Sequence, residues 1–286
     1  MIKTGITSAS YCGFSDYQSG FKKIREHGYD CIDYQEFASY ANSPLYQMSE
    51  EEFSKYLTSV RLCAEENNLK IWQLHGTWPH VDDFSEEGRE ATVEYFKKCI
   101  LGAFHLHCPH VVIHPCMFKG WGQGTKEEMF DMNVALLKKL LPCAEKYGVT
   151  VCMENMPFAK DSTFSTAAEL KAVVRALNSP FIKICLDTGH LNVSKGDMYE
   201  TICLFGDDLA VLHVHDDIYG QDRHLIPFQG EVDWDAFIQG LRKISFQGCI
   251  SLETSISQKM PQPMKEEMQK QLAKIARYFV DEIEKA

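Results

Sequence analysis

The sequence of 286 residues has no feature that would place it in a membrane, in an export pathway or on nucleic acid. No apolar run approaches the roughly 18 residues that a membrane-spanning helix needs. The N-terminal residues lack the long apolar core of a signal peptide, so we expect a cytoplasmic protein without a membrane partner. Basic residues number 29 against 40 acidic ones, for a net charge of −11. Nucleic-acid-binding surfaces are usually basic, so nucleic acid is not the expected partner.

Paired cysteines are also missing. The sequence contains 11 cysteines, an odd number, and no two of them form a CxxC motif. Cys152, Cys185 and Cys249 lie inside apolar, strand-like runs, where a free thiol behaves as a small hydrophobic side chain. We therefore expect reduced cysteines, in keeping with a cytoplasmic location.

Two glycine-rich phosphate-binding motifs are absent. No GxGxxG follows the first strand-like segment, which disfavours a dinucleotide-binding open sheet, and no P-loop is present. No linker rich in Pro, Gly or Ser divides the chain either. The length suits one large α/β barrel, so we expect a single domain over residues 1–286.

The sequence does contain a regular alternation of short apolar segments with longer segments of helical periodicity. Strands that alternate with helices pair in parallel, because a parallel connection needs a crossover. Eight such units at this length predict a single (β/α)8 TIM barrel with eight parallel strands. The predicted strands are Lys3–Tyr11, Asp30–Phe37, Lys70–Gly76, His110–His114, Thr150–Asn155, Lys183–Asp187, Ala210–His215 and Cys249–Glu253. The predicted helices include Met48–Asn67, Ser85–Leu106, Lys126–Tyr147, Thr166–Leu177, Asp197–Leu204, Trp234–Ile244 and Pro261–Ile283, with Ser49, Ser85 and Asp233 as N-caps.

Side chains that can bind a metal end the last six predicted strands. The carboxyl ends of parallel strands meet at one mouth of a barrel, where the catalytic groups of this architecture lie. Burial alone would favour Ser, Thr, Asn or Gly at many of these positions, and converging carboxylates are costly unless a cation neutralises them. We therefore expect one divalent metal ion at this mouth. The residues concerned are His75, His114, Glu154, Asp187, His190, His213, His215 and Glu253, with Asp222 and His224 in the loop after the seventh strand.

The sequence resembles the xylose-isomerase-like TIM-barrel superfamily, which includes the sugar phosphate isomerase/epimerase family, over nearly its whole length. The motifs that carry the resemblance are Met153-Glu154-Asn155, Leu186-Asp187-Thr188-Gly189-His190, His213-Val214-His215-Asp216 and Leu252-Glu253. The resemblance implies four metal ligands: Glu154, Asp187, His213 and Glu253. Three carboxylates with one imidazole suit Mn²⁺, which we expect, with Mg²⁺, Co²⁺ or Zn²⁺ as alternatives.

The resemblance also implies an isomerase or epimerase of a sugar, sugar phosphate or polyol. In the ketose 3-epimerases, one metal-bound glutamate removes the proton beside the carbonyl, and another returns a proton to the opposite face of the enediolate. Glu154 and Glu253 then form the catalytic pair. Residues expected to contact substrate or to hold the ligands in place are His75, His114, His190, His215, Asp222, Arg223, His224, Trp78 and Trp121.

Other functions remain open at this point. Lys160 stands where the ketose 3-epimerases carry a substrate-contacting glutamate, and a lyase of the inosose-dehydratase kind begins with the same proton abstraction. A DNA-repair hydrolase like the type-IV apurinic endonucleases uses three metals. Its nine ligand positions correspond to His75, His114, Glu154, Asp187, His190, His213, Asp222, His224 and Glu253. A barrel that only binds a sugar or a protein partner is a further alternative. Relatives are often dimers or tetramers, so the resemblance is compatible with a homo-oligomer.

Overall fold

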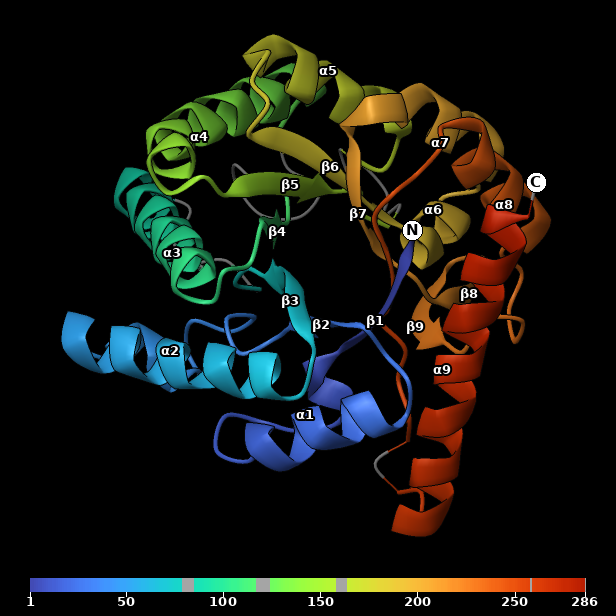
Figure 1. Cartoon of the computed structure of the whole chain (residues 1–286). Coiled ribbons are helices and arrows are strands. Elements are labelled where there is room, and N and C mark those ends of the chain that lie inside the picture. Colours follow the sequence, from blue (N-terminus) through green and yellow to red (C-terminus); the bar gives the residue numbers. More distant parts are fainter. Residues whose placement is uncertain (79–84, 117–123, 158–163, 258, 286) are drawn as a thin grey trace.

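Eight parallel strands form the central sheet in the part of the chain that the structure describes (Figure 1). The structure is a computed structural model, and it describes residues 1–286 apart from 79–84, 117–123, 158–163, 258 and 286. The strand order is β10-β1-β2-β3-β4-β5-β6-β7, so β1 to β7 pair in chain order and β10 pairs with β1. The bounds are β1 Lys3–Thr7, β2 Cys31–Tyr34, β3 Lys70–His75, β4 His110–Ile113, β5 Thr150–Glu154, β6 Ile182–Asp187, β7 Leu209–His213 and β10 Cys249–Leu252.

The barrel closes between β7 and β10 through Val214. This residue forms a parallel bridge with Leu252. The Val214 N–H donates to the Ser251 carbonyl at 2.8 Å, and the Glu253 N–H donates to the Val214 carbonyl at 3.0 Å. The prediction of an eight-stranded parallel (β/α)8 barrel is therefore confirmed.

Helices connect the strands and cover the outside of the barrel (Figure 1). Apolar side chains of these helices are buried, as are Phe53 of α2, Phe96 of α3 and Phe279 of α9. The predicted caps are present, because the side chains of Ser49, Ser85 and Asp233 each accept a backbone N–H in the first turn of a helix. The bounds are α1 Tyr17–Glu26, α2 Glu50–Glu66, α3 Glu86–His105, α4 Lys126–Tyr147, α5 Ala167–Leu177, α6 Thr188–Val193, α7 Met198–Phe205, α8 Trp234–Lys243 and α9 Gln262–Glu284.

The chain departs from the predicted elements around the mouth of the barrel. The first strand ends at Thr7 instead of Tyr11, because the backbone turns into the short 3-10 helix η1 at Ser8–Ser10. Two further 3-10 turns, η2 at Pro44–Gln47 and η3 at Gly206–Asp208, lie in connections. The loop after β7 forms an antiparallel hairpin that the sequence did not predict, with strands β8 (Asp216–Ile218) and β9 (Gln221–Leu225). Such short polar strands carry too few residues for a clear alternation.

The buried carboxylate of Asp216 holds this hairpin and the loop that follows it. Its Oδ1 accepts the N–H groups of Asp217 and Val232, and its Oδ2 accepts Phe228 N–H and Trp234 Nε1–H, at 2.8–3.1 Å. Because Asp216 has no exposed surface, these bonds are protected from water. They fix the hairpin above the C-terminal ends of the strands.

The barrel interior beneath the mouth is filled by small apolar side chains. Val112, Cys152, Cys185 and Val211 form a separate buried cluster. Each lies two residues before a polar residue at a strand end, so strand alternation puts it directly below that residue. The cysteines thus act as small hydrophobic side chains, and all 11 cysteines are free thiols, as expected. None of the described helices is long and apolar enough to cross a membrane.

Candidate metal centre and active site

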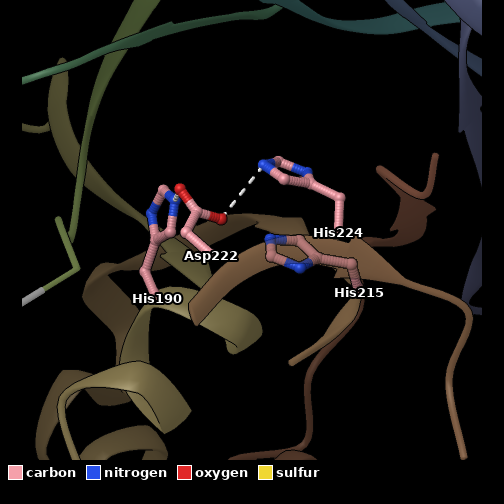
Figure 2. Close-up of side chains that lie close together, drawn as sticks. All are labelled: His190, His215, Asp222 and His224. Atoms are coloured by element: carbon pink, nitrogen blue, oxygen red, sulfur yellow. Dashed lines mark ion pairs between the residues drawn. The ribbon is translucent and has the colours of Figure 1, made fainter. Parts of the chain in front are cut away.

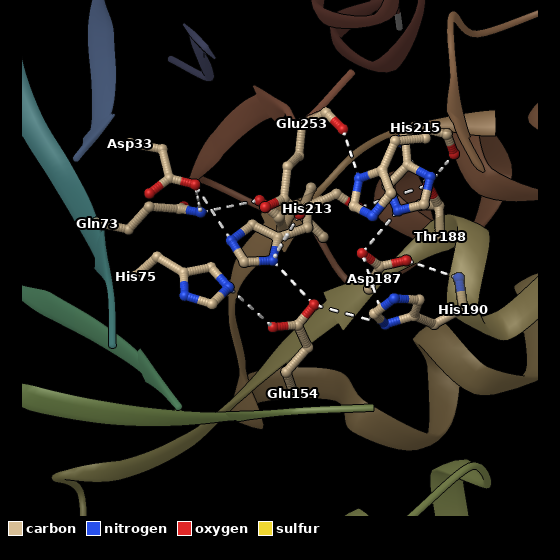
Figure 3. A network of polar contacts seen from close by, with 12 residues as sticks. Asp33, Gln73, His75, Glu154, Asp187, Thr188, His190, His213, His215 and Glu253 are labelled. Atoms are coloured by element: carbon tan, nitrogen blue, oxygen red, sulfur yellow. Dashed lines mark hydrogen bonds and ion pairs between the residues drawn. The ribbon is translucent and has the colours of Figure 1, made fainter. Parts of the chain in front are cut away.

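Four side chains with metal-binding atoms converge at the C-terminal mouth of the barrel (Figure 3). Glu154 ends β5, Asp187 ends β6, His213 ends β7 and Glu253 follows β10. One ligand atom from each lies within 4.8 Å of those of the other three. The structure thus brings together the four residues that the sequence analysis named as ligands. Glu154, Asp187 and His213 are buried and Glu253 is partly exposed, and their three carboxylates and one imidazole form a donor set that fits a divalent cation.

The two ring nitrogens of His213 face different partners. Its Nδ1 lies 2.9 Å from Glu154 Oε1 and 3.2 Å from Glu253 Oε2. Its Nε2 lies 3.1 Å from Asp33 Oδ2. With its Nε2 facing the Asp33 carboxylate, the neutral ring would carry its proton on Nε2 and leave the Nδ1 lone pair for a metal ion.

Asp33 is a buried residue of this centre that the sequence analysis did not name. It comes from β2 and has no exposed surface. Gln73 of β3 donates from its Nε2 to Asp33 Oδ2 at 3.2 Å and to the Leu212 carbonyl at 3.1 Å. An aspartate inside the apolar run Cys31–Tyr34 was the available signal, because a buried carboxylate needs a partner.

Asp187 is held from several directions. Its Oδ1 accepts the His190 N–H at 2.7 Å and caps α6. Its Oδ2 lies 2.8 Å from His215 Nε2, while His215 Nδ1 lies 3.2 Å from Asp217 Oδ2. The Asn155 side chain bonds both the N–H and the carbonyl of Asp187, at 2.8 and 2.9 Å. His215 therefore contacts a predicted ligand, although it lies beyond the end of β7 and not in the strand.

His75 and His114 lie on the other side of Glu154. His114 Nε2 is 3.1 Å and His75 Nε2 is 3.9 Å from Glu154 Oε2. The two rings meet edge to face at 4.9 Å, and the Trp78 ring packs against His114 at 4.7 Å. His75, His114 and Glu154 form a second group that could hold a metal.

A third group of possible metal ligands lies beside Asp187 and consists of His190, His215, Asp222 and His224, the last two from the hairpin (Figure 2). Asp222 is 3.5 Å from His190 Nε2 and 3.4 Å from His224 Nε2. The rings of His215 and His224 stack with centroids 4.0 Å apart. Alternation along β9 directs Asp222 and His224 toward the mouth, whereas Arg223 is exposed and does not line the cavity there. The Arg223 backbone N–H instead donates to Asp217 at 2.6 Å.

Protons balance the charge of this centre in the metal-free protein. Burial alone would raise the pKa of Glu154, but His213 and His114 hold it well below its usual range. Burial would lower the pKa of His213, yet Cys185, Glu154 and Glu253 raise it well above its ordinary value. The pKa of His190 rises to about 9 in the same way, because Asp187 and Asp222 outweigh its burial. A cation that binds the carboxylates would displace these protons.

The centre opens into a cavity of about 350 Å³. Glu154 and Glu253 both border it, so a bound molecule can touch both carboxylates. The other lining residues in the described part of the chain are Gln35, Ala38, His75, Trp78, His114, Met156, Pro157, His190, Asp222 and His224. Trp121 and Lys160, named in the sequence analysis, lie outside the described residues.

Comparisons with known proteins identify the family and the fold. A family model described as "Xylose isomerase-like TIM barrel" matches residues 21–277. The chain is 27% identical over 256 residues to the uncharacterized protein MJ1311 of Methanocaldococcus jannaschii, covering 88% of this chain and 83% of that protein. It is 26% identical over 252 residues to a D-psicose 3-epimerase of Enterocloster bolteae, covering 86% and 79%. The crystal structure of a D-tagatose 3-epimerase-like protein superposes with a TM-score of 0.76 at 25% identity, covering 98% of this chain and 99% of that one.

Proposed function

Because this chain belongs to the xylose isomerase-like TIM-barrel family, we propose that it is a divalent-metal-dependent epimerase or isomerase of a keto sugar. Relatives over most of its length include D-psicose 3-epimerases and a ketose 3-epimerase, which supports a sugar substrate. We further propose that residues 1–286 act as one cytoplasmic catalytic domain, with Mn²⁺ as the physiological ion.

The observation that carries the proposal is the arrangement of Glu154 and Glu253 around His213. Their carboxylates approach the same Nδ1 atom, at 2.9 and 3.2 Å, from β5 and from the end of β10. A sugar carbon between them would have one carboxylate on each face. One glutamate then removes the proton beside the carbonyl, and the other delivers a proton to the opposite face of the enediolate, which inverts the carbon.

Other residues of the chain bind and orient the substrate in this proposal. When bound, the cation would polarise the substrate carbonyl and stabilise negative charge on its oxygen. His190 and His224 border the cavity beside Asp187 and can hydrogen-bond hydroxyl groups of the sugar. Trp78 offers an apolar face, which suits the C–H side of a sugar ring.

Deuterium exchange tests this proposal. The Mn²⁺-loaded protein is incubated in D₂O with a panel of ketoses, inososes and 3-keto sugars. We expect deuterium at the carbon next to a carbonyl, and we expect Glu154→Gln and Glu253→Gln each to abolish the exchange. Glu145→Gln, on the exposed surface of α4, is the matched control. Metal content and circular dichroism are measured for every variant, since both active-site glutamates are also proposed ligands. Full exchange by either active-site variant would refute the acid/base pair. Loss of a β-hydroxyl from the product, instead of inversion, would identify the lyase alternative.

A second candidate function rests on the three groups of possible ligands. All nine residues that correspond to the three-metal DNA-repair hydrolases fall into groups whose ligand atoms lie within 4.8 Å of one another. A phosphodiesterase would bind three metals per chain and cleave a duplex that contains an abasic site. One metal per chain and no cleavage would exclude this candidate.

A further inference from the structure

A second cavity of about 290 Å³ adjoins the catalytic cavity. The two share Gln35, His224 and Glu253 as a common wall. The second cavity lies between η1, the segment that follows β10 and the first turn of α9. Its other described lining residues are Thr7, Ala9, Ser10, Thr254, Ser255, Ile256 and Lys265.

The cavity exists because the chain places small residues after β1 and β10. Ala9 and Ser10 follow the early end of β1, and Ser255 follows β10. The first large residue after β1, Tyr11, turns away from this space, because its hydroxyl bonds the His27 ring at 2.9 Å and its ring meets Tyr29 edge to face.

Hydrogen bonds hold the walls of this cavity in place. The Ser255 N–H donates to the His224 carbonyl at 2.9 Å, which ties the segment after β10 to the hairpin. Gln269 of α9 donates to the Ser10 carbonyl at 2.5 Å, and the Gln35 N–H donates to Ser8 Oγ at 3.0 Å. The space is therefore preorganised and does not depend on loose side chains.

Two buried polar atoms on these walls have no hydrogen-bond partner among the described residues. They are Thr254 Oγ1 and Gln35 Nε2. Thr254 is only 3% exposed, and it lines the second cavity, while Gln35 lines both cavities. An unpaired buried polar group costs about 1–3 kcal/mol, and a side-chain rotation that turns either atom toward a ligand in the cavity would remove that cost.

We propose that the second cavity binds a polar unit attached to the reacting sugar, so that the substrate is a keto sugar carrying a glycosyl group rather than a free ketose. This inference rests on the proposed function. A carbon that reacts at Glu253 lies beside the residues that the two cavities share, so a substituent near it would extend toward the second cavity. The described lining has one carboxylate, Glu253, and one ammonium group, Lys265, together with the hydroxyls of Ser10, Thr254 and Ser255. This mixture suits a neutral unit rich in hydroxyl and ether oxygens.

Matched pairs of sugars test the inference with the Mn²⁺-loaded protein. D-Fructose is compared with its 1-, 4- and 6-O-glucosyl derivatives, and 3-keto-D-glucose with 3-keto-sucrose. We expect the kcat/KM for deuterium exchange to be at least about tenfold higher for a glycosylated member than for its parent. Ser255→Tyr, which adds a large side chain at the wall of the second cavity, is expected to remove this preference. Ser257→Tyr, an exposed position that does not line the cavity, is expected to retain it.

The outcomes separate this inference from the proposed function. Exchange with a free sugar that equals or exceeds exchange with every glycosylated partner would overturn the second cavity as a substrate site while supporting the epimerase proposal. If no sugar exchanges, the proposed chemistry fails, and calorimetric binding of the same pairs decides the inference alone. Tighter binding of a glycosylated member that Ser255→Tyr weakens at least tenfold would support it. Equal binding within all pairs would overturn it.

Discussion

Replacing Asp33 by asparagine would remove the negative charge that faces His213 while keeping the shape of the side chain. Asp33 Oδ2 lies 3.1 Å from His213 Nε2 and accepts Gln73 Nε2 at 3.2 Å. The amide oxygen of the introduced asparagine can serve both donors, and its amide nitrogen would occupy the place of Asp33 Oδ1, which has no partner among the described residues. The variant therefore keeps an oxygen facing both donors and loses the negative charge on it.

The size of the effect follows from the change in that acceptor. A hydrogen bond to a charged group contributes about 1.5–3 kcal/mol, against about 1 kcal/mol for a neutral one. The difference, about 0.5–2 kcal/mol, corresponds to roughly 2- to 30-fold in affinity. Loss of a partner that orients a metal-binding histidine typically costs about 10- to 100-fold. We expect the Kd for Mn²⁺ to rise about tenfold in Asp33→Asn.

Isothermal titration calorimetry of the metal-free protein with Mn²⁺ measures this Kd. Glu36→Gln is the matched control, because it also removes one carboxylate just after β2 but has no contact with His213 among the described residues. Thermal unfolding in EDTA would show that both variants are folded. A folded Asp33→Asn protein that binds Mn²⁺ as tightly as the wild type would refute the role of Asp33 in positioning His213.

Three further predictions concern pH, a surface cluster and the thiols. The pKa of His190 is raised from 6.5 to about 9, so its charge stabilises the metal-free protein fully below pH 6.5. Thermal melts in EDTA should show this stability falling as the pH rises through about 9, while calorimetric Mn²⁺ affinity rises over the same window; a flat affinity would contradict proton displacement. The Asp208 carboxylate accepts hydrogen bonds from Lys171 and Lys183 at 2.6 and 2.8 Å. These bonds lower the pKa of Asp208 although burial would raise it, so the stability that they contribute is lost as the pH falls. Urea unfolding should show that Asp208→Asn costs about 1–2 kcal/mol, whereas the exposed Asp207→Asn changes stability by less than about 0.5 kcal/mol. Because all 11 cysteines are free, a reductant should leave the melting temperature unchanged. A lower melting temperature in reductant would reveal a disulfide.

Regular periodicity explains why most of the fold could be predicted from the sequence. The helix at Lys126–Tyr147 has the predicted bounds, because a capping threonine marks its start and Gly148, with a positive φ of 66°, marks its end. The side chains at the strand ends could be predicted to meet because parallel topology brings them to one mouth. That argument requires only the strand order and the position of each residue along its strand.

The remaining features depend on contacts that periodicity does not encode. Asp33 meets His213 across the barrel, 180 residues later in the chain, and no local pattern announces this pair. His215 was expected on the face of a continuing strand, but the strand ends at His213 and the next residues serve the closure of the barrel. Arg223 was expected to hold substrate oxygens, but the unpredicted hairpin exposes it and turns its two neighbours toward the mouth.

The bridge at Val214 has a consequence for folding and ligand affinity. His213 precedes this residue in the chain, and Glu253 directly follows its partner Leu252, so the seam of the ring runs between two proposed ligands. Closing the barrel and assembling the ligand set are then one event, which joins the seventh strand of the barrel to the last. An ion bound by residues on both sides of this seam would stabilise the closed barrel, because unfolding would have to release it. Resistance to heat should therefore increase with the free concentration of the ion.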